Sequence, residues 1–388
     1  MNSTTLELRK FVAPEIIYGV GAINLVGPSA KKFGAKKALL VTDPGVVEAG
    51  WMDAALRSLK EENIPAAIFQ DITPNPKEHQ VAAGAAFYQD NECDVIVAVG
   101  GGSPMDCAKG IGIAASNKKD ILQFEGIDEV RVPIPPLICI PTTAGTAADI
   151  SQFAIVTDTT RKVKIAIISK AVVPDIALVD PQTTATMPKD LTAATGMDAL
   201  VHAVEAYVSN ASSPLTDLHA MEAISLIAQN LVKAIEDPRN LEYRDHMMFA
   251  SMVAGMAFSN ASLGLVHAMA HSLGGLLDAP HGICNALLLD WVVDFNYQSA
   301  AERYDRIGQA MGVTFDGLGP DVRKEALLRR IRSLAESAGI SRQSLKLELN
   351  NKILNQLAVN ASHDACQVTN PREASVEEIA GIYERAFR

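Results

Sequence analysis

Short apolar runs alternate with longer helical patterns in the first half of the chain, and this alternation constrains the fold more than any other feature. Two helical patterns, at residues 76–90 and 104–115, lie between runs that resemble buried strands. Strand, helix and strand at this spacing are typical of βαβ units, whose strands lie parallel. The sequence therefore predicts an α/β fold with a parallel sheet, with strands at 37–43, 66–69, 94–99 and 137–140.

The pattern changes further along the chain. Two β-rich runs at 153–158 and 163–167 flank a polar turn and predict a hairpin added to that sheet, and the run at 176–179 predicts its last strand. Beyond Pro188, apolar residues recur every three or four positions, which predicts helices. A capping box at Ser375–Glu378 predicts the start of a final helix. We therefore expect an α/β domain over residues 1–185 and an all-α domain over residues 186–388.

Charge and composition exclude several classes of function. The 388 residues carry a net charge of −11, which argues against a nucleic-acid partner or an anionic membrane, because both require a basic surface. No apolar run is long enough to span a bilayer, and the first ten residues are too polar for a secretory signal. Five scattered cysteines fit a reduced chain. We expect a cytoplasmic protein that acts on a small molecule.

Three consecutive glycines follow the strand at 94–99 directly. They let the backbone approach a ligand closely, and Pro104 suits the first turn of the helix that follows. The N–H groups at such a helix start can bind a pyrophosphate. The motif is neither GxGxxG nor a P-loop, so a tight turn without a ligand remains the alternative. The candidate dinucleotide-binding residues of this loop are Gly100, Gly101, Gly102, Ser103 and Asp106.

Polar residues also follow the other predicted strands. Ligands of open α/β sheets collect at the carboxyl ends of the strands, so these residues extend the candidate site. Asp43 can accept a hydrogen bond from a ribose hydroxyl and repel a 2′-phosphate, which favours NAD over NADP, although strand-end aspartates are also common turn formers. The other candidates are Asn75, Thr142, Thr143 and Thr146.

Four of the eight histidines lie close together in the second half of the chain. Asp198 and His202 are four residues apart on one predicted helix, as are His267 and His271 on another, and His281 follows a double glycine. Buried imidazoles and carboxylates need partners, and a shared metal ion would supply one. These ligands suit Fe(II), Zn(II), Co(II) or Ni(II) better than Mg(II) or Ca(II). Spacing alone does not say which histidine lies outside the ligand set, and histidines paired within the core remain the alternative.

Several longer motifs identify a family. The chain resembles the iron-containing (group III) alcohol dehydrogenases nearly from end to end. The resemblance implies a Rossmann-like, dehydroquinate synthase-like dinucleotide domain followed by an all-α metal-binding and substrate domain. It rests on residues 14–21, 100–104, 141–146, 191–200, 264–271 and 364–371.

The resemblance also implies roles for individual residues. It makes His271 the active-site histidine that does not bind metal, and it places Lys164 at an NAD cofactor. It implies that Gln152, Phe258 and Cys366 line the substrate cavity. The ion that the resemblance implies is Fe(II), with Zn(II) as the alternative. The implied metal ligands are Asp198, His202, His267 and His281.

The implied reaction is hydride transfer between a short primary alcohol or diol and nicotinamide, in a homodimer or larger homo-oligomer. Two alternatives remain. A cyclase like dehydroquinate synthase needs lysines or arginines beside its metal to hold acidic groups, and residues 191–210 and 258–290 contain neither. A non-catalytic dinucleotide-binding protein would leave the ligand set without a use.

One segment departs from the family. Where the family reads Gly-Ser-Glu or Gly-Ala-Glu after its threonine turn, this chain reads Ala147-Ala148-Asp149. The change shortens a carboxylate beside the cofactor loop and just before Gln152. We expect it to affect substrate preference but not the class of reaction.

Overall fold

The computed structural model describes residues 10–347 and 349–387, and the chain divides into two compact units. The first unit spans Val12–Met187. The second runs from Pro188 onward and includes Phe11.

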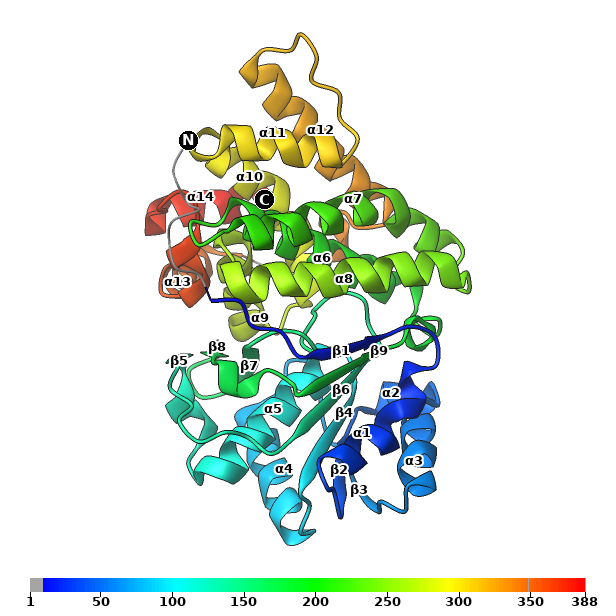
Figure 1. Ribbon diagram of the computed structural model, residues 1–388. Coiled ribbons are helices and arrows are strands. Elements are labelled where there is room, and N and C mark those ends of the chain that lie inside the picture. Colours follow the sequence, from blue (N-terminus) through cyan, green and yellow to red (C-terminus); the bar gives the residue numbers. More distant parts are fainter. Residues whose placement is uncertain (1–9, 348, 388) are drawn as a thin grey trace. The chain divides into compact units, whose positions relative to one another are not determined.

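A six-stranded, fully parallel sheet forms the centre of the first unit (Figure 1). Its order is β1-β9-β6-β4-β2-β3. The predicted α/β fold is confirmed, but β1 was not foreseen. The strands are β1 (Glu15–Tyr18), β2 (Ala38–Val41), β3 (Ala66–Phe69), β4 (Val95–Gly100), β6 (Leu137–Pro141) and β9 (Ile176–Val179).

Alternation along the buried strands gives the sheet a core on each face. Leu39 and Val41 of β2 belong to the core with α4 and α5, whereas Ala38 and Leu40 belong to the core with α1 and α3. Successive side chains of a strand point to opposite faces, so a strand buried on both sides is apolar throughout. The helices are α1 (Val26–Lys32), α2 (Pro44–Glu48), α3 (Trp51–Glu61), α4 (Glu78–Asp90) and α5 (Gly102–Asn117).

The predicted hairpin exists, but it does not join this sheet. Strands β7 (Phe153–Asp158) and β8 (Val163–Ile168) pair antiparallel and form a separate three-stranded sheet with β5 (Gly126–Ile127). The expectation of an extension to the main sheet was therefore wrong. The place beside β6 is taken by β9, and the apolar side of the hairpin instead packs in the core with α5, through Ala154 and Val156.

The second unit is helical, as the apolar spacing predicts. The predicted capping box is confirmed: Ser375 N–H donates to Glu378, and Glu378 N–H donates to the Ser375 hydroxyl. The helices are α6 (Lys189–Val208), α7 (Pro214–Glu236), α8 (Leu241–Ala261), α9 (Leu265–Leu277), α10 (His281–Asn296), α11 (Ala301–Ala310), α12 (Pro320–Ser337), α13 (Asn351–Ser362) and α14 (Val376–Phe387).

Within the described residues, no helix is long and apolar enough by itself to cross a membrane. Helices α8 and α9 pass that test only as a pair, and the pair is bent by 99°. Most of α9, including His267 and His271, is buried within the unit.

Candidate metal centre and cofactor loop

Helix α6 carries three acidic or imidazole side chains on one face. Asp198, His202 and Glu205 are separated by four and three residues, so they follow one another up the same side of the helix. All three are buried, at 2–4% exposure, within a helix whose other buried residues are mostly apolar. Polar groups at such depth need partners. The partners come from two later helices.

Helices α9 and α10 bring the remaining histidines to this face. His267 and His271 lie one turn apart on α9, and His281 is the first residue of α10. Helix α10 approaches α6 so closely that a Cβ atom on Gly282 would lie 2.4 Å from the Ala194 carbonyl oxygen. The glycine therefore allows the two helices to come together beside His281.

Three imidazole nitrogens surround one oxygen of Asp198. The Oδ1 atom is 3.6 Å from His267 Nε2, 3.7 Å from His281 Nε2 and 4.0 Å from His202 Nε2. The ligand atoms of Asp198, His267 and His281 lie within 4.8 Å of one another. Two ligand atoms on one tetrahedral ion, each about 2.1 Å from it, are about 3.4 Å apart. The donor set therefore fits a divalent transition-metal ion with modest contraction.

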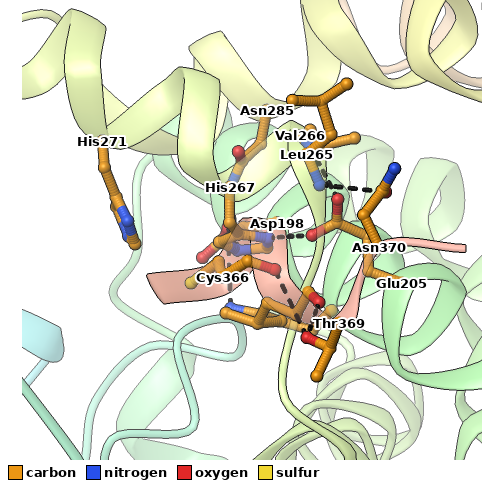
Figure 2. A network of polar contacts seen from close by, with 12 residues as sticks. Asp198, Glu205, Leu265, Val266, His267, His271, Asn285, Cys366, Thr369 and Asn370 are labelled. Atoms are coloured by element: carbon orange, nitrogen blue, oxygen red, sulfur yellow. Dashed lines mark hydrogen bonds and ion pairs between the residues drawn. The ribbon is translucent and has the colours of Figure 1, made fainter. Parts of the chain in front are cut away.

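Asn285, one turn after His281 on α10, lies beside His267 and Asp198 (Figure 2). Its Nδ2 atom is 2.5 Å from Asp198 Oδ1 and 3.2 Å from Nε2 of both His267 and His281. The amide nitrogen of Asn285 thus faces the imidazole lone pairs that would bind a cation. Its buried amide oxygen, an atom that also suits a cation, has no hydrogen-bond partner among the described residues. Both observations favour a cation site.

The pKa values of Asp198 and His267 also fit a site that binds a cation. Burial raises the pKa of Asp198, but the nearby imidazoles of His202, His281 and His267 outweigh it and hold that pKa well below its usual range. Burial lowers the pKa of His267, but hydrogen bonds to Asp198 and Glu205 raise it to about 9. The cluster therefore pairs a firmly ionised carboxylate with imidazoles that it attracts.

His271 lies outside this group. Its Nδ1 atom is 2.9 Å from Asp364 Oδ2, and its ring stacks on that of His281 with centroids 5.3 Å apart. The other oxygen of Asp364 accepts the Cys366 N–H at 2.8 Å. Burial raises the pKa of Asp364, but His271 lowers it below its usual value. His271 is thus held by a carboxylate from a distant segment and not by Asp198.

The predicted cavity residues are divided between the units. Phe258 stacks on His202 with ring centroids 4.3 Å apart, and Cys366 is buried beside Asp364. Gln152 lies in the first unit, directly before β7. Burial raises the pKa of the Cys366 thiol well above its usual value, so it is not a nucleophile at neutral pH.

The glycine loop joins β4 to α5 as predicted. Gly101 is the N-cap of α5, and none of the described side chains caps it. A Cβ on Gly101 would lie 3.1 Å from Thr143 Cγ2, and one on Gly102 would lie 3.0 Å from Thr146 Cγ2. Side chains at these positions would fill the space between the loop and the threonine turn.

The structure brings most of the predicted cofactor residues to the carboxyl edge of the sheet. Thr142 N–H donates to the Gly100 carbonyl, and Asn75 N–H donates to the Ser103 hydroxyl at 3.3 Å. Asp43 follows β2 and caps α2, where Oδ1 accepts the Val46 N–H at 3.0 Å. Asp43 therefore also has the turn-forming role that the sequence left open.

Lys164 is on β8 of the hairpin, and Asp106 of α5 lies against the hairpin. Burial raises the pKa of Asp106 to about 7, although Lys109, a backbone hydrogen bond at Ile155 and Lys164 each lower it. Lys109 is fully buried on α5, and its ammonium donates to the carbonyls of Ser151 and Phe153 at 2.7 Å each. These contacts fix the loop that carries Gln152.

Three residues of the metal centre were not predicted: Glu205, Asn285 and Asp364. Each is polar, buried or nearly so, and bonded to a predicted histidine. For Glu205 a signal was present, because it continues the helix face of Asp198 and His202 in an otherwise apolar segment. Asp364 reaches His271 across 93 residues, and no local pattern could reveal that contact.

A parallel-sheet unit with a glycine loop and a helical unit with a carboxylate–histidine centre are the parts expected of a metal-dependent enzyme that uses a dinucleotide. The model of iron-containing alcohol dehydrogenases matches residues 13–181, and that of the C-terminal part of the Fe-containing alcohol dehydrogenase family matches residues 192–387. The chain belongs to the iron-containing alcohol dehydrogenase family, as its sequence motifs predict.

Individual relatives cover almost the whole chain. It is 43% identical to 1,3-propanediol dehydrogenase of Klebsiella pneumoniae, over 97% of this chain and 98% of the relative. It is 37% identical to the NAD-dependent methanol dehydrogenase of Bacillus methanolicus, over 97% and 99% respectively. A crystal structure of 1,3-propanediol oxidoreductase superimposes with a TM-score of 0.94 at 43% identity, covering 98% of this chain and all of that one.

Proposed function

We propose that the chain is a metal-dependent, NAD-linked dehydrogenase of short primary alcohols or diols, which also reduces the corresponding aldehydes. Residues 12–187 bind the dinucleotide, and the helical residues from Pro188 onward bind the metal and the substrate. The convergence of three imidazole nitrogens on Asp198 Oδ1 carries the proposal.

Asp198, His202, His267 and His281 hold the cation, which is Fe(II), with Zn(II) as the alternative. When bound, the ion polarises the substrate oxygen as a Lewis acid, and the nicotinamide accepts or donates the hydride. Either ion suits imidazole and carboxylate ligands, so its supply during folding decides which one is present.

Around that centre, the residues of the chain bind the substrate and move its proton. Phe258, stacked on His202, presents an apolar wall, and Cys366 lines the cavity beside His271. His271 receives the hydroxyl proton, and Asp364 at its Nδ1 atom holds the ring in position. Small apolar walls of this kind favour short alcohols.

The glycine loop and the turns beside it bind NAD. The backbone of Gly100–Gly102 approaches the pyrophosphate, and Thr142, Thr143 and Thr146 border it on the neighbouring turn. One oxygen of Asp43 accepts the Val46 N–H, and its negative charge disfavours a 2′-phosphate. Asn75, Ser103, Asp106 and Lys164 complete the cofactor site. The methanol dehydrogenase relative is named for the same cofactor.

The test is an NADH absorbance assay with methanol, ethanol, 1,2-propanediol and 1,3-propanediol, on anaerobically purified protein whose metal content has been measured. His267→Ala should remove both the metal and the activity while the parallel sheet stays folded, as circular dichroism would show. A His267→Ala protein with full turnover and no metal would disprove the proposed mechanism.

Two further properties belong to this proposal. The five cysteines are buried and form no disulfide with one another, which supports a reducing compartment such as the cytoplasm. Strand β1 lies at an edge of the sheet, where Tyr18 is 36% exposed, which supports a homodimer or a larger homo-oligomer. Light scattering on the purified chain would measure the number of subunits.

A further inference from the structure

Glu205 is buried one turn beyond His202, yet it is not among the metal ligands proposed above. Its two oxygens accept one hydrogen bond each. Oε2 lies 2.6 Å from His267 Nδ1, and Oε1 accepts the Val266 N–H at 2.6 Å (Figure 2). Both donors belong to the first turn of α9, so one carboxylate on α6 fixes the start of the helix that carries His267.

The first turn of α9 leaves room for the Glu205 carboxylate. Its N-cap is Gly264, which has no side chain to accept the first N–H groups. Glu205 accepts the one from Val266, and Asn370 Oδ1 accepts the one from Leu265 at 3.2 Å. A Cβ on Gly264 would lie 2.9 Å from Glu205 Oε1 and 3.0 Å from Asn370 Oδ1. Any larger residue at Gly264 would displace both acceptors.

We propose that Glu205 is a positioning residue that prepares His267 for the metal, an inference that rests on the proposed function. By accepting a hydrogen bond from Nδ1, it keeps the proton on that nitrogen and leaves Nε2 directed at Asp198 Oδ1, 3.6 Å away. Metal-ligating histidines commonly have their other ring nitrogen fixed in this way, which sets the tautomer and raises the basicity of the ligand. The bond to Val266 fixes the carboxylate itself.

Glutamine at this position separates the proposal from a purely structural role. The carboxylate accepts two hydrogen bonds through two oxygens, whereas a carboxamide has one oxygen and one NH2 group. In Glu205→Gln, the NH2 group must therefore face either His267 Nδ1 or the Val266 N–H. The first orientation favours the imidazole tautomer with its proton on Nε2, which leaves Nε2 unable to bind a metal. The second keeps the Nδ1 proton but replaces its anionic acceptor by a neutral oxygen, which makes the imidazole a weaker ligand, and it also weakens the start of α9.

The experiment uses the full chain and Zn(II) as a diamagnetic probe. Competition with a chromogenic chelator should show Zn(II) affinity 10- to 100-fold weaker in Glu205→Gln than in the wild type, with the Tm of the metal-free protein changed by only a few degrees. In wild-type protein loaded with Zn(II) and labelled with 15N-histidine, the His267 proton should lie on Nδ1, where it is assigned by its proximity to the Val266 amide proton on the same carboxylate.

The control is Asn370→Ala, which removes the other acceptor at the start of α9 without touching the imidazole. It should lower the Tm but leave Zn(II) affinity within about threefold of the wild type. Unchanged Zn(II) affinity in Glu205→Gln, equal losses in both variants, or a His267 proton on Nε2 would each overturn the role of Glu205. If Glu205→Gln does not fold, the position of the His267 proton in the wild-type spectrum tests the proposal by itself. A wild-type chain that binds no cation contradicts the proposed function itself, and with it this inference.

Discussion

Replacing Gly282 by alanine should disturb the metal centre more than it disturbs the fold. Gly282 follows the ligand His281 at the start of α10, where the helix meets the backbone of α6. The added Cβ would lie 2.4 Å from the Ala194 carbonyl oxygen and 2.8 Å from its carbonyl carbon. An ordinary carbon–oxygen contact is about 3.3 Å, so the two helices must move apart by about 1 Å.

This displacement is small for a helix but large for a metal site. Overpacking of this kind costs about 1–3 kcal/mol, and each kcal/mol lowers the Tm of a unit of about 200 residues by roughly 2–4 °C. Metal–ligand distances, by contrast, tolerate only about ±0.2 Å. Because Asp198 and His202 lie on α6 and His281 lies on α10, we expect at least a tenfold loss of metal affinity in Gly282→Ala.

The assay is chelator competition with Zn(II), in parallel with thermal unfolding of the metal-free protein. Gly319→Ala is the matched control, because a Cβ at Gly319, the N-cap of α12, has no atom within 4 Å. It should change neither quantity appreciably. If Gly282→Ala lost stability but kept wild-type metal affinity, the approach of α10 to α6 would not set the geometry of the site.

Three other predictions test the remaining parts of the site. His271→Ala should lower turnover but keep its metal by elemental analysis, and loss of the metal would place His271 among the ligands. Gly101→Val should weaken NADH binding on the order of tenfold in a fluorescence titration, because even its Cβ would lie 3.1 Å from Thr143 Cγ2, and unchanged binding would contradict the role of the loop. Burial raises the pKa of Asp106 to about 7, so between about pH 4 and pH 7 the unfolded chain releases a proton that the folded chain keeps, and the free energy of unfolding should fall by at most about 4 kcal/mol. Asp106→Asn should therefore raise the Tm more at pH 8 than at pH 5, and an equal change at both values would show that Asp106 ionises freely.

The positions of the central strands could be read from the sequence because both faces of these strands are buried. Strands such as β2 and β4 are apolar throughout, and their short length together with the helical patterns between them favours buried strands over buried helices. Strand β1 was missed because its end residues, Glu15 and Tyr18, are exposed at the edge of the sheet. The hairpin was recognised but misplaced, since local periodicity does not reveal which surface a strand covers.

Local sequence patterns also could not reveal the tertiary contacts of the metal centre. Helical spacing identified Asp198 with His202 and His267 with His271, because each pair lies on one turn of one helix. It could not show that His271 meets Asp364 and leaves the group, since that contact depends on tertiary packing. Family motifs supplied that distinction for the histidine, but not for the carboxylates that hold the rings.

In the sequence, the shortened carboxylate of Asp149 comes just before Gln152, which suggests a direct effect on the substrate. In the structure its charge instead acts on Lys109. Asp149 is 4% exposed; burial raises its pKa to about 6, while the Lys109 ammonium lowers it. Lys109 in turn binds the carbonyls on both sides of Gln152. A shorter carboxylate here therefore has no direct way to meet a substrate. We therefore expect any effect on substrate preference to pass through the charge of Lys109, whose ammonium fixes the loop that carries Gln152.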